Sequence, residues 1–151
     1  MNTKEYKNPI PTVDAIIQRR SEILLIRRKK GPFKNMLALP GGFVNDNETV
    51  EDAIIREVSE ETTLEIKLLD ILGVYSDPNR DPRKHIMTTV FIGEINGDNT
   101  IKAVAADDAS EIVWIDLASV EKYGFGFDHK KIINDYKKWK LGRGTFWSSK
   151  N

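Results

Sequence analysis

The amino-acid sequence predicts an α+β fold in a single domain. Its 151 residues suit one domain and are enough for a genuine core. Segments rich in aliphatic and β-branched residues are interspersed with helical patterns without regular alternation, which argues against a doubly wound parallel sheet. No internal repeat, low-complexity tract or linker divides the chain. We therefore expect one domain over residues 1–151, with a core of about residues 12–141 and a tail of residues 142–151.

The first half of the chain carries two strand patterns and a helix. Residues 12–17 and 22–28 are typical of strands joined by a polar turn. Residues 39–42, Leu-Pro-Gly-Gly, predict a chain reversal in which the glycines let the backbone approach a ligand closely. The helix is expected to begin near Thr49, because Thr49 followed by Asp52 is a plausible capping box.

The second half is expected to add three strands and a final helix. Residues 64–74 and 85–95 indicate strands, the latter closed by an Asn-Gly turn, and residues 112–115 indicate a short third strand. Asp128 is a good N-cap for a helix that ends at Gly142, and its apolar stripe is typical of core packing. The tail, which contains Phe146 and Trp147, is expected to be partly disordered or packed on a partner.

Composition restricts the compartment and the partners. The 23 Lys and Arg residues balance 23 Asp and Glu residues, so no strong field draws the chain to nucleic acid or to an anionic membrane. The absence of cysteine fits a reducing compartment. The first residues lack an apolar signal core, and no run approaches the ~20 apolar residues of a membrane span. We therefore expect a cytoplasmic protein with neither nucleic acid nor membrane as a partner.

The expected helix carries an unusual group of acids. Glu57, Glu60 and Glu61 lie on one side of it, and that side also holds Val50 and Ile54. An isolated Glu-x-x-Glu-Glu pattern is usually a solvated face, but crowded half-buried carboxylates are unfavourable unless a cation is present. Hard oxygen ligands without histidine or cysteine favour Mg²⁺ or Mn²⁺ over Zn²⁺. The fitting reaction is metal-assisted hydrolysis of a phosphoric anhydride.

This segment closely resembles the signature of the Nudix hydrolases. The matching positions are Gly42, Glu48, Arg56, Glu57, Val58, Glu60, Glu61 and Leu64. Thr63 departs from the pattern, since the family has a glycine there that ends the helix with positive φ. The resemblance implies an α/β/α sandwich, in which a mixed β-sheet lies between helices.

The resemblance also implies roles for residues of the signature. Glu57 and Glu61 would be the principal metal ligands, with the Gly41 carbonyl adding a backbone oxygen and Glu60 acting as a further ligand or holding a water. Gly42, Glu48 and Arg56 would hold the loop and the helix together. Glu111, in an acidic loop similar to one that supplies the base in relatives, is the preferred general base. Glu60 is the competing candidate, and an ordinary solvated loop remains an equal alternative for Glu111.

Residues 73–85 supply the best clue to the substrate. Arginine can bind phosphate through two parallel hydrogen bonds, and carboxylates can accept ribose hydroxyls. Arg80 and Arg83 are therefore candidate phosphate ligands, Asp77 or Asp81 could bind ribose, and Tyr75 could stack on a base. On the residues alone, a rigid charged turn is the more common explanation.

The same run, Ser-Asp-Pro-x-Arg-Asp-Pro-Arg, resembles that of ADP-ribose pyrophosphatases within the Nudix family, as does the segment of residues 125–129. Arg28 is a plausible phosphate contact and Phe127 a plausible wall for adenine or ribose, whereas His129 is expected to start a helix rather than to catalyse.

The expected function is Mg²⁺- or Mn²⁺-dependent hydrolysis of a small-molecule nucleotide, ADP-ribose, to AMP and ribose 5-phosphate. One alternative keeps the enzyme class and changes the substrate to a nucleoside triphosphate or a dinucleoside polyphosphate. Another is a non-catalytic nucleotide-sensing module, which Thr63 would favour. A homodimer stays open, because relatives are often dimers and the aromatic tail could serve an interface.

Overall fold

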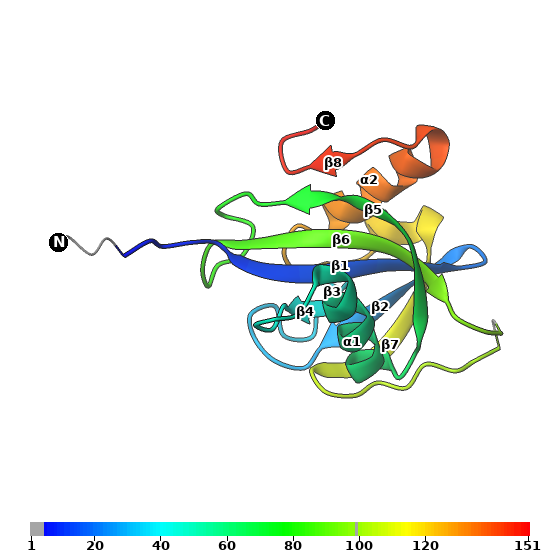
Figure 1. The fold of residues 1–151 in the computed structure, drawn as a ribbon. Coiled ribbons are helices and arrows are strands. Elements are labelled where there is room, and N and C mark those ends of the chain that lie inside the picture. Colours follow the sequence, from blue (N-terminus) through cyan, green and yellow to red (C-terminus); the bar gives the residue numbers. More distant parts are fainter. Residues whose placement is uncertain (1–4, 99) are drawn as a thin grey trace.

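The computed structural model describes residues 5–98 and 100–151, which form a mixed β-sheet with a helix against each face (Figure 1). The strand order is β3-β2-β1-β6-β5-β8, while β4 pairs with β1 and β7 pairs with β2. The β1–β6 and β5–β8 pairs are parallel and the other pairs are antiparallel, so the α+β prediction is confirmed. The elements are β1 (Ile10–Arg19), β2 (Glu22–Arg28), β3 (Leu37–Ala38), β4 (Gly41–Phe43), α1 (Val50–Thr62), β5 (Ile66–Tyr75), β6 (Ile86–Ile95), β7 (Ala109–Asp116), the 3₁₀ helix η1 (Leu117–Lys122), α2 (His129–Gly142) and β8 (Phe146–Trp147).

The central strand β1 divides the interior into two apolar cores. Successive side chains of a strand point to opposite faces of the sheet. Val13, Ala15 and Ile17 accordingly pack in the core that contains the buried residues of α1, whereas Ile16 packs in the core that contains those of α2. Asp14 shares the α2 side with Ile16. The sheet therefore lies between the two helices, as the α/β/α prediction requires.

Helix α1 begins where the sequence predicts, and Thr63 ends it in the conformation that the glycine of the family signature would adopt. Thr49 is its N-cap, and the Thr49 hydroxyl accepts a hydrogen bond of 3.1 Å from the backbone N–H of Asp52. After Thr62 the chain turns at Thr63, which has φ 63° and ψ 5° and donates its N–H to the Ser59 carbonyl. A β-branched residue therefore occupies the left-handed conformation that glycine adopts without strain.

The tail prediction is wrong. Phe146 is only 5% exposed, and β8 pairs in parallel with β5 through Gly73↔Phe146 and Val74↔Trp147. The pairing is close because Gly73 has no side chain: a Cβ there would lie 1.9 Å from the Phe146 carbonyl oxygen. The sequence did not predict this strand, because β8 has only two residues and is too short to show an alternating apolar pattern. The segment that follows α2 therefore belongs to the sheet.

The start of α2 differs in one respect from the prediction. Asp128 is the N-cap residue, but its side chain makes no capping hydrogen bond. Both carboxylate oxygens instead accept from Arg80, at 3.0 and 2.7 Å. A residue expected to stabilise a helix end thus holds the loop between β5 and β6.

Replacing Thr63 with glycine should stabilise the fold. Removing the strain of the left-handed conformation should stabilise the folded state by about 1–2 kcal/mol. The extra conformational entropy of glycine in the unfolded chain should offset about 0.4–1 kcal/mol of this gain. We expect the free energy of unfolding to rise by about 0.5–1 kcal/mol, measured by urea denaturation. Glu65→Gly, at an exposed position without positive φ, is the control and should lower it. An equal loss in both variants would contradict the strain at Thr63.

Candidate active site

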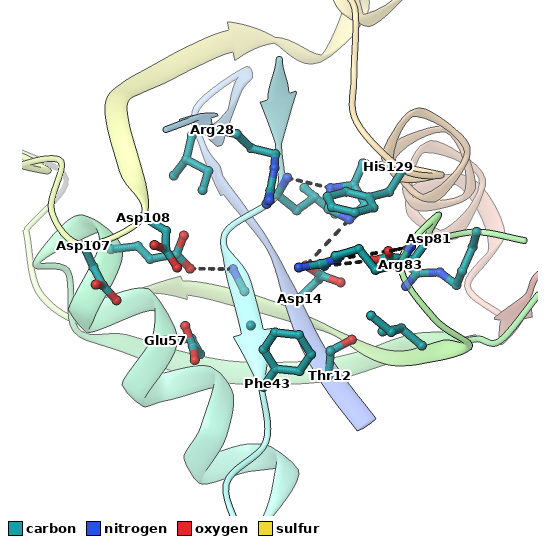
Figure 2. A pocket seen from close by; sticks show the side chains of 18 residues that line it. Thr12, Asp14, Arg28, Phe43, Glu57, Asp81, Arg83, Asp107, Asp108 and His129 are labelled. Carbon is teal, nitrogen blue, oxygen red and sulfur yellow. Dashed lines mark hydrogen bonds and ion pairs between the residues drawn. The ribbon is translucent and has the colours of Figure 1, made fainter. Parts of the chain in front are cut away.

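A pocket of about 150 Å³ opens where β1, β2, β4 and α1 meet three loops (Figure 2). Its two sides have opposite character. Glu57, Asp107 and Asp108 lie on one side of β4, and Asp81, Arg83 and His129 lie on the other (Figure 2). The chain is neutral overall, but in this pocket the carboxylates of Glu57, Asp107 and Asp108 lie across β4 from the Arg83 guanidinium.

The acidic side is built on the second half of α1. Glu61 is 2% exposed, and its Oε1 accepts a 2.9 Å hydrogen bond from the backbone N–H of Gly41. Burial, together with the charges of Glu57, Asp14 and Asp108, raises the pKa of Glu61 to about 9. Burial also raises the pKa of Glu57. These carboxyl groups are therefore unfavourable as neighbouring anions until a positive charge approaches them.

Glycine is required in β4 because the loop packs directly against these acids. A Cβ at Gly42 would lie 2.5 Å from the carboxyl carbon of Glu57. A Cβ at Gly41 would lie 2.1 Å from the Val13 carbonyl oxygen and 2.5 Å from Asp14 Oδ1. The two glycines thus place backbone atoms within reach of both the helix carboxylates and β1.

Arg56 ties the acidic helix to the preceding loop. Its guanidinium donates to Glu48 at 2.7 and 2.8 Å and to the Phe43 carbonyl at 3.0 Å. It also donates to Glu57 Oε1 at 2.9 Å and to Glu60 Oε2 at 3.2 Å. This fork engages one oxygen of Glu57, and the other oxygen has no hydrogen-bond partner among the described residues.

On the cationic side, Arg80 and Arg83 are both held by carboxylates. The Arg80 side chain is 3% exposed and forms a two-bond pair with Asp128. Arg83 forms a similar pair with Asp81, whose carboxylate also accepts the Arg83 backbone N–H at 2.9 Å. Asp81 therefore positions Arg83, and its oxygens are already engaged rather than free for a ribose hydroxyl.

Arg28 reaches the same side from the end of β2. Its Nε donates to the Pro32 carbonyl at 2.7 Å, and its guanidinium lies 4.9 Å from the centroid of the Phe127 ring. Burial and the nearby Arg83 charge lower its pKa, which shows how closely the cationic groups crowd. An anionic ligand would relieve that repulsion.

Sequence reasoning missed Asp14 and underestimated His129. Thr88 donates a 2.7 Å hydrogen bond to Asp14 Oδ2, and burial raises the pKa of Asp14 to about 7. Leu39 donates its backbone N–H to His129 Nδ1 at 2.9 Å, and His129 Nε2 lies 3.7 Å from Asp14 Oδ1. The available signal was a lone carboxylate inside the apolar run of β1. His129 starts α2 as expected, and it also lines the pocket.

Four candidates are not where the chemistry assigned to them would need them. Glu60 is exposed and lies outside the pocket, because Arg56 draws it along the helix surface. Glu111 is exposed on β7, where it lies 3.7 Å from Arg27, so Asp107 and Asp108 are the residues of the acidic loop that line the pocket.

Tyr75 is fully buried and its hydroxyl donates to Asp135, so it cannot stack on a base. Asp77 lies outside this pocket and lines a neighbouring one.

The carboxylates that remain suit a hard divalent cation. Within residues 5–98 and 100–151, no three acidic or histidine side chains form a ready-made metal cluster. Glu57 and Glu61 nevertheless face one small pocket with raised pKa values, and the Gly41 and Gly42 backbone lies beside them. Magnesium and manganese characteristically bind through one or two carboxylates and complete their shells with water and phosphate. The donor set therefore fits such an ion.

The fold and the pocket define an α/β/α domain in which a carboxylate-bearing helix packs on a glycine loop. A family model described as the NUDIX domain matches residues 8–136. The chain therefore belongs to the Nudix family.

Known proteins of this family resemble the chain over most of its length. An ADP-ribose pyrophosphatase from Methanocaldococcus jannaschii is 50% identical over 137 residues, which cover 91% of this chain and 78% of that protein. A bifunctional NMN adenylyltransferase/ADP ribose pyrophosphatase from Francisella tularensis, solved with AMP and a manganese ion, is 31% identical with a TM-score of 0.77. The match covers 93% of this chain but only 44% of that one. The NUDIX domain of Shewanella oneidensis NrtR, solved with ADP ribose, is 25% identical with a TM-score of 0.76 and 90% coverage of both chains.

His129 should make stability depend on pH. Burial and the charges of Arg80 and Arg28 lower its pKa from 6.5 to about 3. As pH falls below 6.5, His129 becomes protonated in the unfolded chain but stays neutral in the folded protein. The free energy of unfolding should therefore fall by up to about 1.4 kcal/mol per pH unit.

His129→Asn is the comparison, because the Asn amide oxygen can still accept the Leu39 N–H without binding a proton. The difference between the two proteins in the free energy of unfolding, measured by urea titration from pH 7.5 to pH 5, isolates the histidine. Parallel pH profiles would contradict the buried neutral imidazole.

Proposed function

We propose that this protein hydrolyses ADP-ribose to AMP and ribose 5-phosphate with the help of Mg²⁺ or Mn²⁺. The observation that carries the proposal is the two-sided pocket, which Glu57, Glu61, Arg28 and Arg83 all line and in which Glu57 and Arg83 lie on opposite sides of β4 (Figure 2). A diphosphate needs cationic donors on one side and a carboxylate-held cation on the other. The 50% identity to the Methanocaldococcus jannaschii enzyme supports the same substrate.

Each residue has a distinct part in this reaction. Glu57 and Glu61, with the Gly41 carbonyl, would hold the cation, which when bound neutralises the diphosphate and lowers the pKa of an attacking water. Arg28 and Arg83 would bind and orient the phosphate oxygens. Asp107 and Asp108 line the pocket beside Glu57 and would take the proton of the water, in place of the exposed Glu60 and Glu111.

A sensor remains the second candidate. The NUDIX domain of NrtR binds ADP ribose and superposes on nearly the whole chain, so the pocket could bind this ligand without cleaving it. Against this stands the full set of signature acids, Glu57, Glu60 and Glu61. A nucleoside triphosphate or dinucleoside polyphosphate substrate is less well supported, because the relative that is 50% identical to this chain is an ADP-ribose pyrophosphatase.

The remaining predictions concern a membrane, a second subunit, nucleic acid and the cellular compartment. No helix in the described part of the chain is long and apolar enough to cross a membrane. Val74 and Trp147 are paired across β5 and β8 and are 39% and 48% exposed, so this edge is where we would look for a second subunit. The homodimer, the cytoplasmic location, the single domain and the absence of a nucleic-acid partner stay predictions.

Glu61→Gln and Glu57→Gln should each lower kcat at least ~100-fold, comparable with removal of other groups that stabilise charge in a transition state. Both should still fold, because each amide keeps the size of the carboxyl it replaces. Steady-state kinetics with ADP-ribose, together with Mn²⁺ titration by electron paramagnetic resonance, measures turnover and metal binding separately.

Glu60→Gln is the matched control on the same helix. It removes the same charge from an exposed side chain that lies outside the pocket, so kcat should stay within about tenfold of wild type. A loss as large as that of Glu61→Gln would return Glu60 to the metal site, and near-wild-type rates in Glu57→Gln or Glu61→Gln would remove the metal site from α1.

The products distinguish the candidate functions. With Mg²⁺ or Mn²⁺, ADP-ribose should give AMP and ribose 5-phosphate in equal amounts, resolved by ion-exchange chromatography. Free pyrophosphate from nucleoside triphosphates at a higher kcat/KM would favour the alternative substrate. Tight ADP-ribose binding without any product would favour the sensor.

A further inference from the structure

A second pocket adjoins the first and is nearly three times larger. It measures about 440 Å³ against about 150 Å³, and Arg80 and Phe127 line both. Sites that enclose a ligand of drug size measure roughly 300–1,000 Å³. The first pocket is therefore large enough for a diphosphate and a cation but not for a whole nucleotide sugar. One end of the substrate has to extend beyond it, and the second pocket lies directly beside it.

The walls of the second pocket suit a flat aromatic group. Phe33 and Phe127 form an edge-to-face pair with ring centroids 4.8 Å apart, and Pro82 adds a further apolar surface. Every nucleobase has a flat π-face and can stack on an aromatic side chain, whichever base it is. A ribose offers mainly hydroxyl groups and gains little binding energy from aromatic walls.

The rim of the second pocket carries polar groups that a base edge can use. Asp77 accepts the Asn79 backbone N–H through Oδ1 at 2.8 Å, and its other oxygen has no hydrogen-bond partner among the described residues. The Asn79 amide likewise has no partner there, and it offers both a donor and an acceptor. A heteroaromatic base presents both kinds of group along one edge.

The C-terminal segment builds part of this pocket. Ser148 lines it, and the Ser148 hydroxyl accepts the backbone N–H groups of Ser76 and Asp77 at 3.0 and 3.1 Å. Lys131, another lining residue, donates to the Lys150 carbonyl at 3.1 Å. The residues that follow β8 thus hold the start of the loop that carries Asp77 and Asn79.

We propose that the second pocket binds the nucleobase of the substrate, with Phe33 as the stacking wall and Asn79 at the base edge, and that the segment after α2 holds the loop in place for this contact. The proposal rests on the proposed function for its substrate, ADP-ribose. It places the AMP half of that molecule on the Phe33 side of Arg80 and the ribose 5-phosphate half on the opposite side.

The test uses the two products as separate probes, because only AMP carries a base. Phe33→Ala should weaken competitive inhibition by AMP about tenfold or more, in line with the loss of one base–aromatic stack, and should leave inhibition by ribose 5-phosphate unchanged. Phe33→Tyr keeps the ring and should behave as wild type. Tyr123→Ala is the control, because it removes an aromatic ring that is 40% exposed and lines neither pocket.

Asn79→Ala provides a second variant at an exposed loop position, where folding is not at risk. It should weaken AMP inhibition several-fold and again spare ribose 5-phosphate. Weaker inhibition by ribose 5-phosphate with unchanged AMP inhibition would overturn the assignment in favour of the terminal ribose. Unchanged inhibition by both products in both variants would show that the pocket is not used.

Binding measurements separate this proposal from the proposed function. If the protein does not hydrolyse ADP-ribose, calorimetric titration with AMP still reports on the second pocket. Weaker AMP binding in Phe33→Ala but not in Tyr123→Ala would then support the base site while the hydrolase proposal fails. AMP binding that is equal in wild type and Phe33→Ala would overturn the base site whether or not hydrolysis occurs.

Discussion

The burial of Glu61 against Gly41 is the constraint on which the rest of the site depends. A carboxylate that is 2% exposed keeps only one backbone hydrogen bond, and its pKa of about 9 records how strongly the protein disfavours its charge. Gly42 must also lack a side chain for the helix to approach the loop so closely. Glu61 has no ion-pair partner among the described residues, and Glu57 shares Arg56 with Glu48 and Glu60. The pocket is therefore receptive to a cation, since a positive charge compensates the solvation that these buried acids have lost.

On the opposite side of the pocket, carboxylates position the arginines instead of stabilising a helix end or binding a ligand. Asp128 could cap α2, but its carboxylate holds Arg80 instead, and Asp81 holds Arg83 rather than a ligand. Each pair fixes a cation at the edge of the pocket with little freedom left to lose on binding. Helix ends and loop acids are therefore used to pre-organise the arginines, at some cost in helix stability.

Local patterns predicted the parts of the fold that depend on local interactions. The Thr49 cap and the inward side of Glu57 and Glu61 follow from spacing within one helix. Tyr75, Glu111 and the tail failed because their positions depend on partners distant in sequence. Tyr75 is turned inward by Asp135, Glu111 outward by the register of β7 against β2, and Phe146 is buried by a two-residue pairing with β5.

Strand β1 explains why both halves of the site meet at one place. Its odd positions, Val13 and Ala15, pack with α1, so the acidic helix lies against that face. Its even position Asp14 faces the α2 side, where His129 and Arg80 are anchored. Gly41 pairs directly with Asp14 at the end of the glycine loop. A pleated strand thus sends one face to each helix, and the pocket forms where the loop crosses between them.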